Sequence, residues 1–291
     1  MIPAPLLNTE LIRDELAKHD QLKGPAMKLT TIDLQRPTPH LAHVYLNRPE
    51  VRNAFNDTSI AELTAVFTEL AADAHLRAIV LGGHGKAFCA GADLAWMREM
   101  AGYTWSENHA DAQALAEMLW AFDRCPVPVV GRIHGDCYAG GVGLAAACDV
   151  LVAAEGVNFC LSEARLGLLP ATISPYVIRA MGEQAARRYF VTAERFTAAQ
   201  AQAMGMVHEL VAADAIDAKV DELVATLLAN GPMATRACKA LVHDVAGVAI
   251  TPELRADTAR RIADIRASDE GRDGVQSFLN KRAPAWLAEP R

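Results

Sequence analysis

The stretch GDCYAGGVGL, residues 135–144, is the part of this chain that says most about its fold and its chemistry. It follows an apolar segment typical of a strand, 127–133, and leads into residues 144–148, which are typical of a short buried helix. The glycines at 140, 141 and 143 have no Cβ atom, so a ligand is able to approach the backbone closely. A helix start also leaves backbone N–H groups without partners, and its dipole favours negative charge there. The stretch therefore predicts a preformed site for an anion or a developing oxyanion.

A second glycine turn, KAFCAGADL at residues 86–94, resembles the first. It also follows an apolar strand, 78–81, and opens a helix predicted over 94–100. Two such turns are able to aim two N–H donors at one carbonyl oxygen. Further on, LSEARLGLLP at 161–170 places Glu163 among apolar residues, a setting that raises the pKa of a carboxyl group and suits it to proton transfer. Two donor turns and an isolated acid predict enolate chemistry beside a carbonyl.

Length and composition narrow the class of protein. The chain has 291 residues, near the upper limit for one hydrophobic core, so one large domain with an appendage is expected. Its 52% hydrophobic and 22% charged residues are typical of a soluble globular protein, and no apolar run reaches the length of about 18 residues that suggests a membrane span. The net charge of −7 argues against nucleic acid or a membrane as a partner, and an anionic ligand would need a local basic patch. The N-terminus has no basic segment followed by an apolar one, which predicts a cytoplasmic protein.

The cysteines and histidines indicate neither a zinc site nor another metal centre. The six cysteines include no C-x-x-C pair, and those between residues 125 and 160 follow a spacing that matches no zinc pattern. Most lie in apolar surroundings, which predicts buried free thiols. The nine histidines form no H-E-x-x-H pattern, so no metal is expected.

One segment matches a dinucleotide-binding fingerprint, but its context does not fit that function. Residues 141–146 follow the pattern G-x-G-x-x-A, and Glu163 lies at about the spacing expected of the acidic partner. The next strand starts near residue 149, which leaves only a very short helix, whereas a parallel crossover needs about a dozen residues. A nicotinamide cofactor is therefore not expected. The sequence also has no G-x-S-x-G nucleophile elbow, which argues against a serine hydrolase.

Apolar periodicity predicts strands that alternate with helices over most of the chain. The predicted strands are 28–34 and 43–46, separated by prolines 37 and 39, then 78–81, 127–133, 150–153 and 158–161. The predicted helices are 11–22, 60–70, 94–100, 112–122 and, after an N-cap at Ser174, several that run to residue 280. This order favours an α/β fold with a mostly parallel sheet. We expect an N-terminal extension at 1–26, an α/β core at 27–195 and a helical C-terminal region at 196–291.

Five motifs, taken in order, resemble the crotonase family, the enoyl-CoA hydratases and isomerases. They are LNRP at 46–49 with NAF at 53–55, CAGAD at 89–93, the Gly140-Gly141 turn, the Glu163 segment and FLNKRAP at 278–284. The similarity runs from about residue 30 to residue 286. It implies a crotonase-like ββα spiral core with a helical C-terminal trimerisation region. It also implies an acyl-CoA thioester as the substrate, no separate cofactor, and a homotrimer or a dimer of trimers. We expect subunit contacts from apolar positions of the C-terminal region such as Leu223, Val224, Leu227 and Leu228.

The resemblance also implies roles for individual residues. The backbone N–H groups of Ala92 and Gly140 would bind the thioester oxygen, and Glu163 would transfer the proton. Substrate contacts would come from Arg52, Ala54, Ala90, Gly91, Asp93, Leu94, Tyr138, Gly141, Gly143 and Lys281. In the family the backbone at Ala54 would meet the adenine, and Lys281 would meet phosphates, often those of a neighbouring subunit's ligand. Structural alternatives stay open: a helix cap for Asp93, packing for Tyr138 and the glycines, and surface charge for the basic residues.

The chain departs from the two-glutamate hydratases of this family at Gly143, where many of them carry a second glutamate. The segments GGVGL at 140–144 and PATISPY at 170–176, together with Glu163, resemble the bacterial methylglutaconyl-CoA hydratases of leucine breakdown. This implies hydration of a branched, carboxylated enoyl-CoA, with 3-methylglutaconyl-CoA as the leading substrate. The missing side chain at Gly143 predicts room for the branch or the carboxylate. Two alternatives are an enoyl-CoA isomerase, for which one shuttling glutamate is enough, and a non-catalytic acyl-CoA-binding protein.

Overall fold

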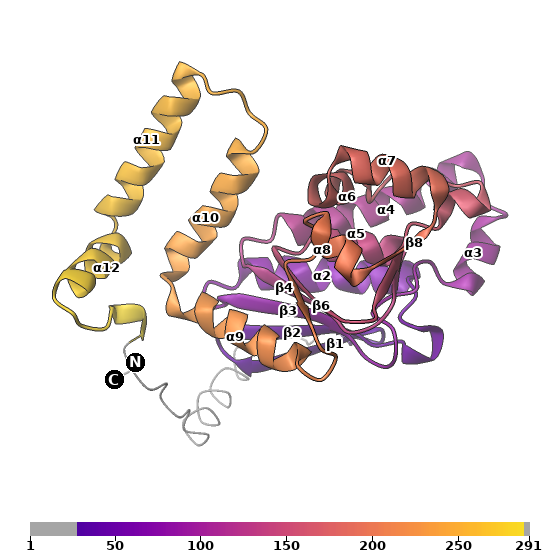
Figure 1. The fold of residues 1–291 in the computed structure, drawn as a ribbon, viewed down its shortest axis with the longest axis horizontal. Coiled ribbons are helices and arrows are strands. Elements are labelled where there is room, and N and C mark those ends of the chain that lie inside the picture. Colours follow the sequence, from indigo (N-terminus) through magenta and orange to yellow (C-terminus); the bar gives the residue numbers. More distant parts are fainter. Residues whose placement is uncertain (1–27, 288–291) are drawn as a thin grey trace.

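The computed structural model describes residues 28–287, so the predicted extension 1–26 and the helix predicted at 11–22 lie outside the described residues. Within this range the strands form a six-stranded sheet, ordered β1-β2-β3-β4-β6-β9, and a three-stranded sheet, ordered β5-β7-β8 (Figure 1). The larger sheet comprises β1 (Ile32–Thr38), β2 (Leu41–Leu46), β3 (Ala78–Gly83), β4 (Val129–Ile133), β6 (Val150–Ala154) and β9 (Glu209–Val211). The smaller sheet comprises β5 (Cys137–Tyr138), β7 (Asn158–Cys160) and β8 (Arg195–Thr197).

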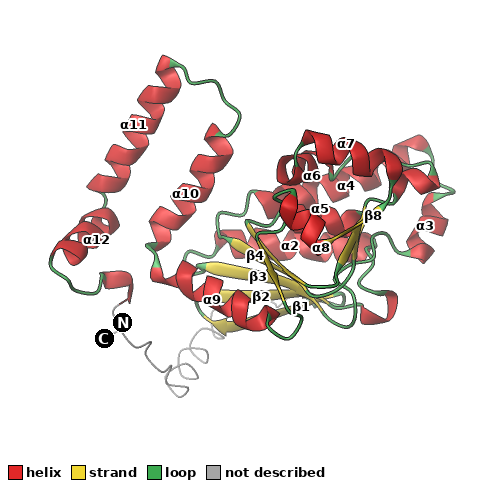
Figure 2. Cartoon of the chain, in the orientation of Figure 1, coloured by secondary structure: helices red, strands yellow, loops and turns green. Residues whose placement is uncertain are grey.

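Helices cover the sheets and continue beyond them as an arm (Figure 2). The core carries α2 (Asp57–Ala72), α3 (Leu94–Met100), α4 (Trp105–Asp123), α5 (Gly140–Ala146), α6 (Ser174–Met181), α7 (Glu183–Thr192), α8 (Ala198–Ala203) and α9 (Ile216–Ala229), with the short 3-10 turns η2 (Pro49–Val51) and η3 (Glu163–Leu166). The C-terminal arm, residues 232–279, comprises α10 (Pro232–Val245), α11 (Pro252–Ala267) and α12 (Asp269–Leu279), and the 3-10 turn η4 (Ala285–Leu287) follows it. Between residues 28 and 287, no helix is both long and apolar enough to cross a membrane.

The central strands of the larger sheet, β3, β4 and β6, are mostly buried on both faces, which explains their continuous apolar runs. Every residue of β3 is buried, and from β2 to β9 each strand pairs in parallel with its neighbour. Parallel strands need cover on both faces, and α9 supplies part of it by packing on β3, β4 and β6. The helices α2 and α4 pack on each other through Phe67 and Phe122, whose ring centroids lie 4.4 Å apart. These layers confirm the predicted α/β class.

The first strand and two helix starts differ from the sequence-based expectations. Strand β1 begins at Ile32 rather than 28 and continues through Pro37, which an edge strand tolerates because one side needs no ladder hydrogen bond. The register of β1 against β2 shifts between Gln35 and Thr38. Helix α6 has Ile173 as its N-cap, while the Ser174 hydroxyl donates to the Ala171 carbonyl, so the predicted cap was one residue late.

The smaller sheet sets the position of the glycine stretch. Strands β5 and β7 run parallel, with Tyr138 opposite Cys160. Because parallel strands end at the same edge, the segments that follow them, α5 and η3, start close together. Helix α5 begins at Gly140 itself, not at residue 144 as expected, so the glycines form its first turn. This arrangement brings the Gly140 turn and Glu163 to one edge of the sheet.

The C-terminal arm extends away from the sheets and is tied back at its base (Figure 1). The Glu270 carboxylate of α12 accepts hydrogen bonds from the backbone N–H groups of Met233 and Ala234, at 2.9 and 2.8 Å, and so caps the start of α10. The Arg236 side chain of α10 donates to the carbonyl of Asp73, at 2.7 Å, at the end of α2. These bonds fix where the arm leaves the core.

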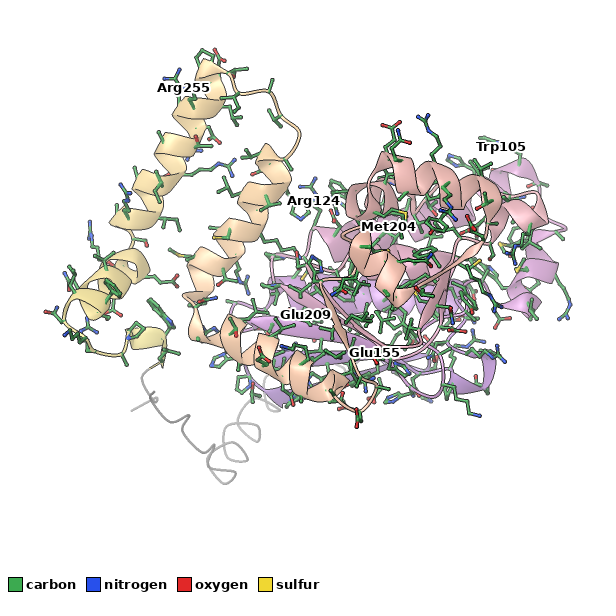
Figure 3. The ribbon with its side chains drawn as sticks, in the orientation of Figure 1. Trp105, Arg124, Glu155, Met204, Glu209 and Arg255 are labelled. Carbon is green, nitrogen blue, oxygen red and sulfur yellow. The ribbon has the colours of Figure 1, made fainter. Side chains whose placement is uncertain are left out.

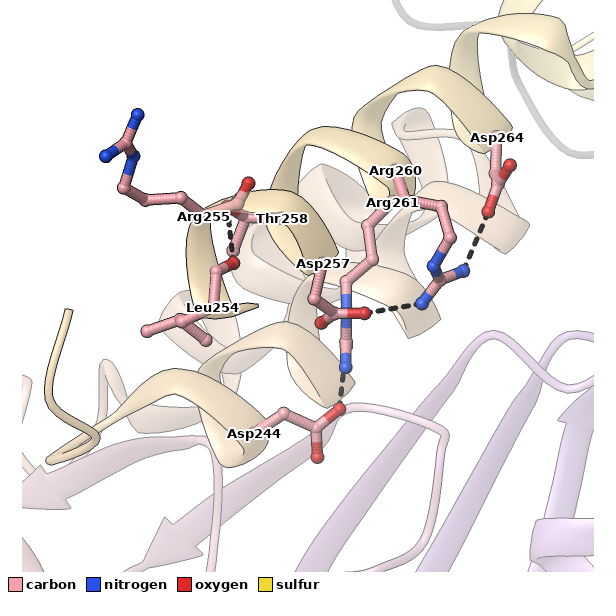
Figure 4. Close-up of polar contacts among 8 residues, drawn as sticks. All are labelled: Asp244, Leu254, Arg255, Asp257, Thr258, Arg260, Arg261 and Asp264. Atoms are coloured by element: carbon pink, nitrogen blue, oxygen red, sulfur yellow. Dashed lines mark hydrogen bonds and ion pairs between the residues drawn. The ribbon is translucent and has the colours of Figure 1, made fainter. Parts of the chain in front are cut away.

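Ion pairs lie along α11, and one of them joins α11 to α10 (Figure 4). Arg261 contacts Asp257 on its own helix at 2.6 Å and Asp244 on α10 at 2.7 Å, and Arg260 contacts Asp264 at 3.0 Å. All are at least partly exposed, and such surface pairs contribute about 0–1 kcal/mol each. They orient the two helices more than they stabilise the fold. Arg255 lies near the tip of the arm (Figure 3).

Uncovered apolar side chains lie on the arm rather than on α9. Val224 is buried in the core, and Leu223, Leu227 and Leu228 are partly buried against it, so the subunit contacts expected of these four residues stay a prediction. On the arm, Phe278 is 84% exposed. The sheet also takes its last strand, β9, from beyond residue 195, so the helical region does not begin directly at that position. The division of the chain into units stays a prediction.

Candidate active site

The first donor turn is held against residue 55 by two backbone hydrogen bonds. The Phe55 N–H donates to the Gly91 carbonyl at 2.6 Å, and the Asp93 N–H donates to the Phe55 carbonyl at 2.7 Å. Ala92 therefore lies between two fixed neighbours. Gly91 has a φ of +92°, and a Cβ atom there would lie 2.8 Å from the Cβ atom of Ala139. Only glycine fits both the conformation and the contact.

The second donor turn lies directly beside the first. Tyr138 donates from its backbone N–H to the Cys89 carbonyl at 2.8 Å, and Ala139 donates to the Cys160 carbonyl at 2.8 Å. A Cβ atom built on Gly140 would lie 3.1 Å from the Phe55 ring. Phe55 therefore contacts both turns, through its backbone at Ala92 and through its ring at Gly140.

Both predicted donors have a free N–H group within the described structure. Gly140 is the first residue of α5, where the helix offers its N–H no acceptor, and across residues 28–287 neither this group nor the Ala92 N–H donates to another backbone or side-chain acceptor. Ala90 is different, because its N–H donates to the Arg52 carbonyl at 3.0 Å. The two unpaired donors thus lie on turns that both contact Phe55, and a pair of such donors is what binding of an oxyanion requires.

Glu163 lies at the start of η3 and is partly buried. Its Oε2 atom is buried and, over the part of the chain that the structure describes, has no hydrogen-bond partner. Burial raises the pKa of this carboxyl group, as the sequence predicted. The neighbouring side chains Leu166, Leu168 and Leu169 are exposed and apolar. An acid with a raised pKa beside an open apolar surface is suited to proton transfer in a hydrophobic ligand site.

The glycines of α5 make room for protein atoms, not for a ligand. A Cβ atom on Gly141 would lie 2.7 Å from the Cβ atom of Cys89, and one on Gly143 would lie 2.2 Å from Cγ2 of Ile173. Ile173 is itself buried. The room predicted at Gly143 for a branch or a carboxylate is therefore absent, because Ile173 fills it. For Gly141 and Gly143 the structural alternative, close packing, is the correct one.

Asp93 is a helix cap and an ion-pair partner. Its carboxylate accepts from the Ala95 N–H at 2.7 Å, at the start of α3, and pairs with Arg48 at 2.7 Å. Burial alone would raise the pKa of this carboxyl group, but the hydrogen bonds from Ala95 and Arg48 outweigh burial and lower the pKa. Asp93 is thus held ionised by its own neighbours. Leu94, which follows it, is exposed and has no such local role.

A pocket of about 410 Å³ opens beside the first donor turn. Its lining includes Arg52, Lys86, Ala90, His134, Asp136, Tyr138 and Glu155, the last of which is labelled in Figure 3. The Tyr138 hydroxyl donates to Asp136 at 2.5 Å, and burial together with this bond raises the pKa of Tyr138 to about 12. Asp136 also accepts from the Asn158 N–H at 3.1 Å, so its carboxylate is occupied structurally. Sequence reasoning missed Lys86, whose only signal was a positive charge next to the turn.

Two of the residues predicted to contact the substrate, Ala54 and Lys281, are poorly placed to do so within a single chain. The Ala54 N–H donates to the Val51 carbonyl at 3.2 Å, and its carbonyl accepts from Arg48 at 2.8 Å, so both backbone groups already have protein partners. Lys281 follows α12, which lies on the far side of α10 from the sheet (Figure 1). Contact of Lys281 with this pocket would have to come from another subunit.

The described part of the chain shows no arrangement for a metal or a disulfide. Between residues 28 and 287, no group of three or more His, Cys, Asp or Glu side chains is placed to hold a metal ion. The six cysteines are free, and Cys238 is the exposed one among them. The candidate site is therefore built from backbone donors, the carboxyl group of Glu163 and a neighbouring pocket whose lining includes Arg52 and Lys86.

Comparisons with known proteins identify related sequences and a related fold. Residues 38–289 match the profile of the enoyl-CoA hydratase/isomerase family. The chain is 34% identical over 254 residues to an enoyl-CoA hydratase of Alternaria alternata, covering 84% of this chain and 80% of that protein. It is 31% identical over 242 residues to the 2,3-dehydroadipyl-CoA hydratase of Escherichia coli (strain K12), covering 82% and 92%. The crystal structure of an enoyl-CoA hydratase from Shewanella pealeana ATCC 700345 superposes with a TM-score of 0.86 at 37% identity, covering 89% of this chain and 97% of that one. This likeness confirms the predicted crotonase-like fold.

Proposed function

The chain belongs to the enoyl-CoA hydratase/isomerase family, and we propose that it is an enoyl-CoA hydratase that adds water across the double bond of a 2-enoyl-CoA thioester. One observation carries this proposal. The unpaired N–H groups of Ala92 and Gly140 lie on two turns that both contact Phe55, and the Gly140 turn starts at the sheet edge where Glu163 keeps a buried, unpartnered oxygen. These are the parts that stabilise an enolate and move its proton.

In the proposed reaction the two N–H groups bind the thioester oxygen, and Glu163 first accepts a proton and then returns one. The Ala92 and Gly140 N–H groups donate to the thioester oxygen, which makes the β-carbon electrophilic. Glu163 accepts a proton from water while the water oxygen bonds to the β-carbon, and the electron pair of the double bond moves into the enolate. Glu163 then returns a proton to the α-carbon, and the carbonyl re-forms. The raised pKa of Glu163 makes its carboxylate a stronger base, which favours the first transfer, in which it takes a proton from water.

The pocket beside the first donor turn has two cationic side chains for the anionic part of an acyl-CoA. Arg52 and Lys86 line it next to Ala90, and we assign their charges to the phosphates of coenzyme A. Lys281 would add a further contact from a neighbouring subunit. The exposed apolar residues of the arm, such as Phe278, support a homotrimer or a dimer of trimers, since large exposed apolar surface favours association.

For the acyl group, 3-methylglutaconyl-CoA remains the leading candidate. It is supported by the likeness of residues 170–176 to the methylglutaconyl-CoA hydratases. A second support is the E. coli relative, a 2,3-dehydroadipyl-CoA hydratase, since adipate is also a dicarboxylic acid. Gly143 no longer supports it, because Ile173 occupies the space beside it. The proposed place of action is leucine breakdown in the cytoplasm.

An enoyl-CoA isomerase is the second candidate, and the same contact favours it. Ile173 packs on Gly143, where two-glutamate hydratases carry their second acid, so Glu163 is left without that partner. Isomerisation needs only one acid, which removes a proton from one carbon and returns it to another. A non-catalytic acyl-CoA-binding protein is the third possibility that the assay must separate.

The test is product analysis in water enriched in ¹⁸O with a panel of enoyl-CoA thioesters that includes 3-methylglutaconyl-CoA and a 3-enoyl-CoA. Hydration places the label in a 3-hydroxy product, whereas migration of the double bond without label supports the isomerase. We expect Glu163→Gln to lower kcat by at least about 10²-fold while acyl-CoA binding survives. Glu183→Gln, an exposed exchange on α7, is the matched control. Binding without turnover by the native protein would leave the non-catalytic function.

A further inference from the structure

Arg48 holds two parts of the site at once. Its Nη1 atom donates to the Ala54 carbonyl at 2.8 Å, and its Nη2 atom donates to the Asp93 carboxylate at 2.7 Å. The side chains of Arg48 and Asp93 are only 19% and 9% exposed, so water competes little for this pair. No other part of the mechanism described above uses Arg48.

A rigid path leads from Arg48 to the Ala92 N–H through two peptide groups. The Ala54 carbonyl and the Phe55 N–H belong to one planar trans peptide, so fixing the carbonyl with Arg48 also fixes the direction of the N–H. That N–H donates to the Gly91 carbonyl at 2.6 Å. The Gly91 carbonyl and the Ala92 N–H form the second planar peptide, in which the N–H points away from the carbonyl and hence away from Phe55.

The other branch from Arg48 fixes the chain on the far side of Ala92. Asp93 accepts from Arg48 with one carboxylate oxygen and from the Ala95 N–H with the other, at 2.7 Å each. Its own N–H donates to the Phe55 carbonyl at 2.7 Å. The residues on both sides of Ala92 are thus held by hydrogen bonds that lead back to the guanidinium group of Arg48.

We propose that Arg48 is a positioning residue that sets the direction of the Ala92 N–H donor toward the thioester oxygen. This inference rests on the proposed function, in which that N–H polarises the acyl-CoA carbonyl. Arginine is required because its planar fork reaches two acceptors, whereas the single ammonium of lysine is a point charge that does not reproduce the fork. Loss of the fork should weaken the donor and leave the binding of the rest of coenzyme A intact.

The experiment measures carbonyl polarisation directly. A dimethylaminocinnamoyl-CoA probe absorbs at longer wavelength when its thioester carbonyl accepts hydrogen bonds, so its spectral shift on binding reports the two donors. For Arg48→Lys and Arg48→Met we expect a smaller shift, a kcat lowered by about 10- to 10²-fold and a KM within about threefold of wild type. Asp93→Asn keeps the shape of its side chain and should give an intermediate effect.

Controls separate positioning from folding and from the proposed function itself. Arg36→Lys alters a comparable, partly buried Arg–Asp pair with Asp73, remote from the donors, and should leave the shift and kcat unchanged. Glu163→Gln should keep the full shift, because it removes the acid and not the donors. If Arg48→Met does not fold, Arg48→Lys keeps the charge and most of the packing.

A full shift and near-normal kcat in folded Arg48→Lys and Asp93→Asn would overturn the positioning role. A native protein that binds the probe without any shift would overturn the donor site, and the role of Arg48 with it.

Discussion

Substitution of Gly143 by alanine tests whether Ile173 occupies the space where the second acid of related hydratases would begin. The new Cβ atom would lie 2.2 Å from Cγ2 and 2.6 Å from Cβ of Ile173, each well inside the ordinary contact range of 3.4–4 Å. Ile173 is buried and has nowhere to move without displacing its neighbours. We therefore expect Gly143→Ala to destabilise the fold.

The size of the effect follows from two opposing contributions. Overpacking by one methyl group in a dense core costs about 1–3 kcal/mol, and this contact is severe. Replacing glycine by alanine in a helix returns about 0.5–1 kcal/mol. The free energy of unfolding should therefore fall by about 1–2 kcal/mol, which corresponds to a Tm lower by roughly 2–8 °C for a domain of this size.

A second substitution distinguishes this contact from a general defect. Ile173→Ala still leaves a Cβ atom 2.6 Å from the new methyl group, so it should relieve the clash only in part. Ile173→Gly leaves the Cα atom at 3.7 Å, an ordinary contact, and should remove it. Each Ile173 variant has its own cost of about 2–5 kcal/mol from lost packing, so the informative quantity is the coupling with Gly143→Ala in a double-mutant cycle.

Thermal and urea unfolding at one fixed protein concentration measure these differences, since association would otherwise shift the apparent stability. Gly102→Ala is the control, because a Cβ atom there would lie 3.5 Å from the Glu99 carbonyl oxygen, an ordinary contact. It should change stability by less than about 0.5 kcal/mol. A Gly143→Ala variant as stable as wild type, or a cycle that is additive with both Ile173 variants, would refute the packing argument.

Four further outcomes are expected from the structure. Because burial raises the pKa of Glu163, activity should fall on the acid side at a pH above the ordinary range of a glutamate, which a profile of kcat/KM against pH measures. The pKa of Glu163 is higher in the folded than in the unfolded state, so its contribution to stability is present below the unfolded pKa and is lost as pH rises through the folded pKa. Thermal unfolding should therefore find Glu163→Gln more stable than wild type at pH 8 but not at pH 4. Glu270→Ala removes the cap from Met233 and Ala234 and should cost about 1 kcal/mol, with faster hydrogen exchange confined to the start of α10. Phe278→Glu should lower the molar mass found by light scattering if the arm forms the subunit contact, and an unchanged mass would contradict that role.

Local sequence was sufficient for the features that depend on near neighbours. The cap at Asp93 could be predicted because the residue directly precedes α3, and its carboxylate bonds to an N–H two residues further on. The raised pKa of Glu163 followed from the apolar residues around it in the chain. The α/β class followed from the order of apolar runs and helical periods, which depend on burial alone.

The roles of Gly141, Gly143 and Arg48 could not be predicted in this way. Sequence shows that a glycine has no side chain, but not which atom takes the vacated space; here Cys89 and Ile173 take it, from other elements of the fold. The same holds for Arg48, whose two acceptors lie on different segments. Its position in a family motif marked it without showing what it holds.

The sequence by itself determined the family, the two glycine turns and the single acid, because each is written in a continuous stretch of residues. Only the tertiary structure decided that Phe55 joins the two turns and that the space beside Gly143 is closed. It also decided that large apolar side chains such as Phe278 are exposed on the arm, whereas those of α9 pack against the core. The physical reason is that hydrogen-bond direction and close packing depend on atoms brought together by folding, whereas helix, strand and turn preferences act over a few neighbouring residues.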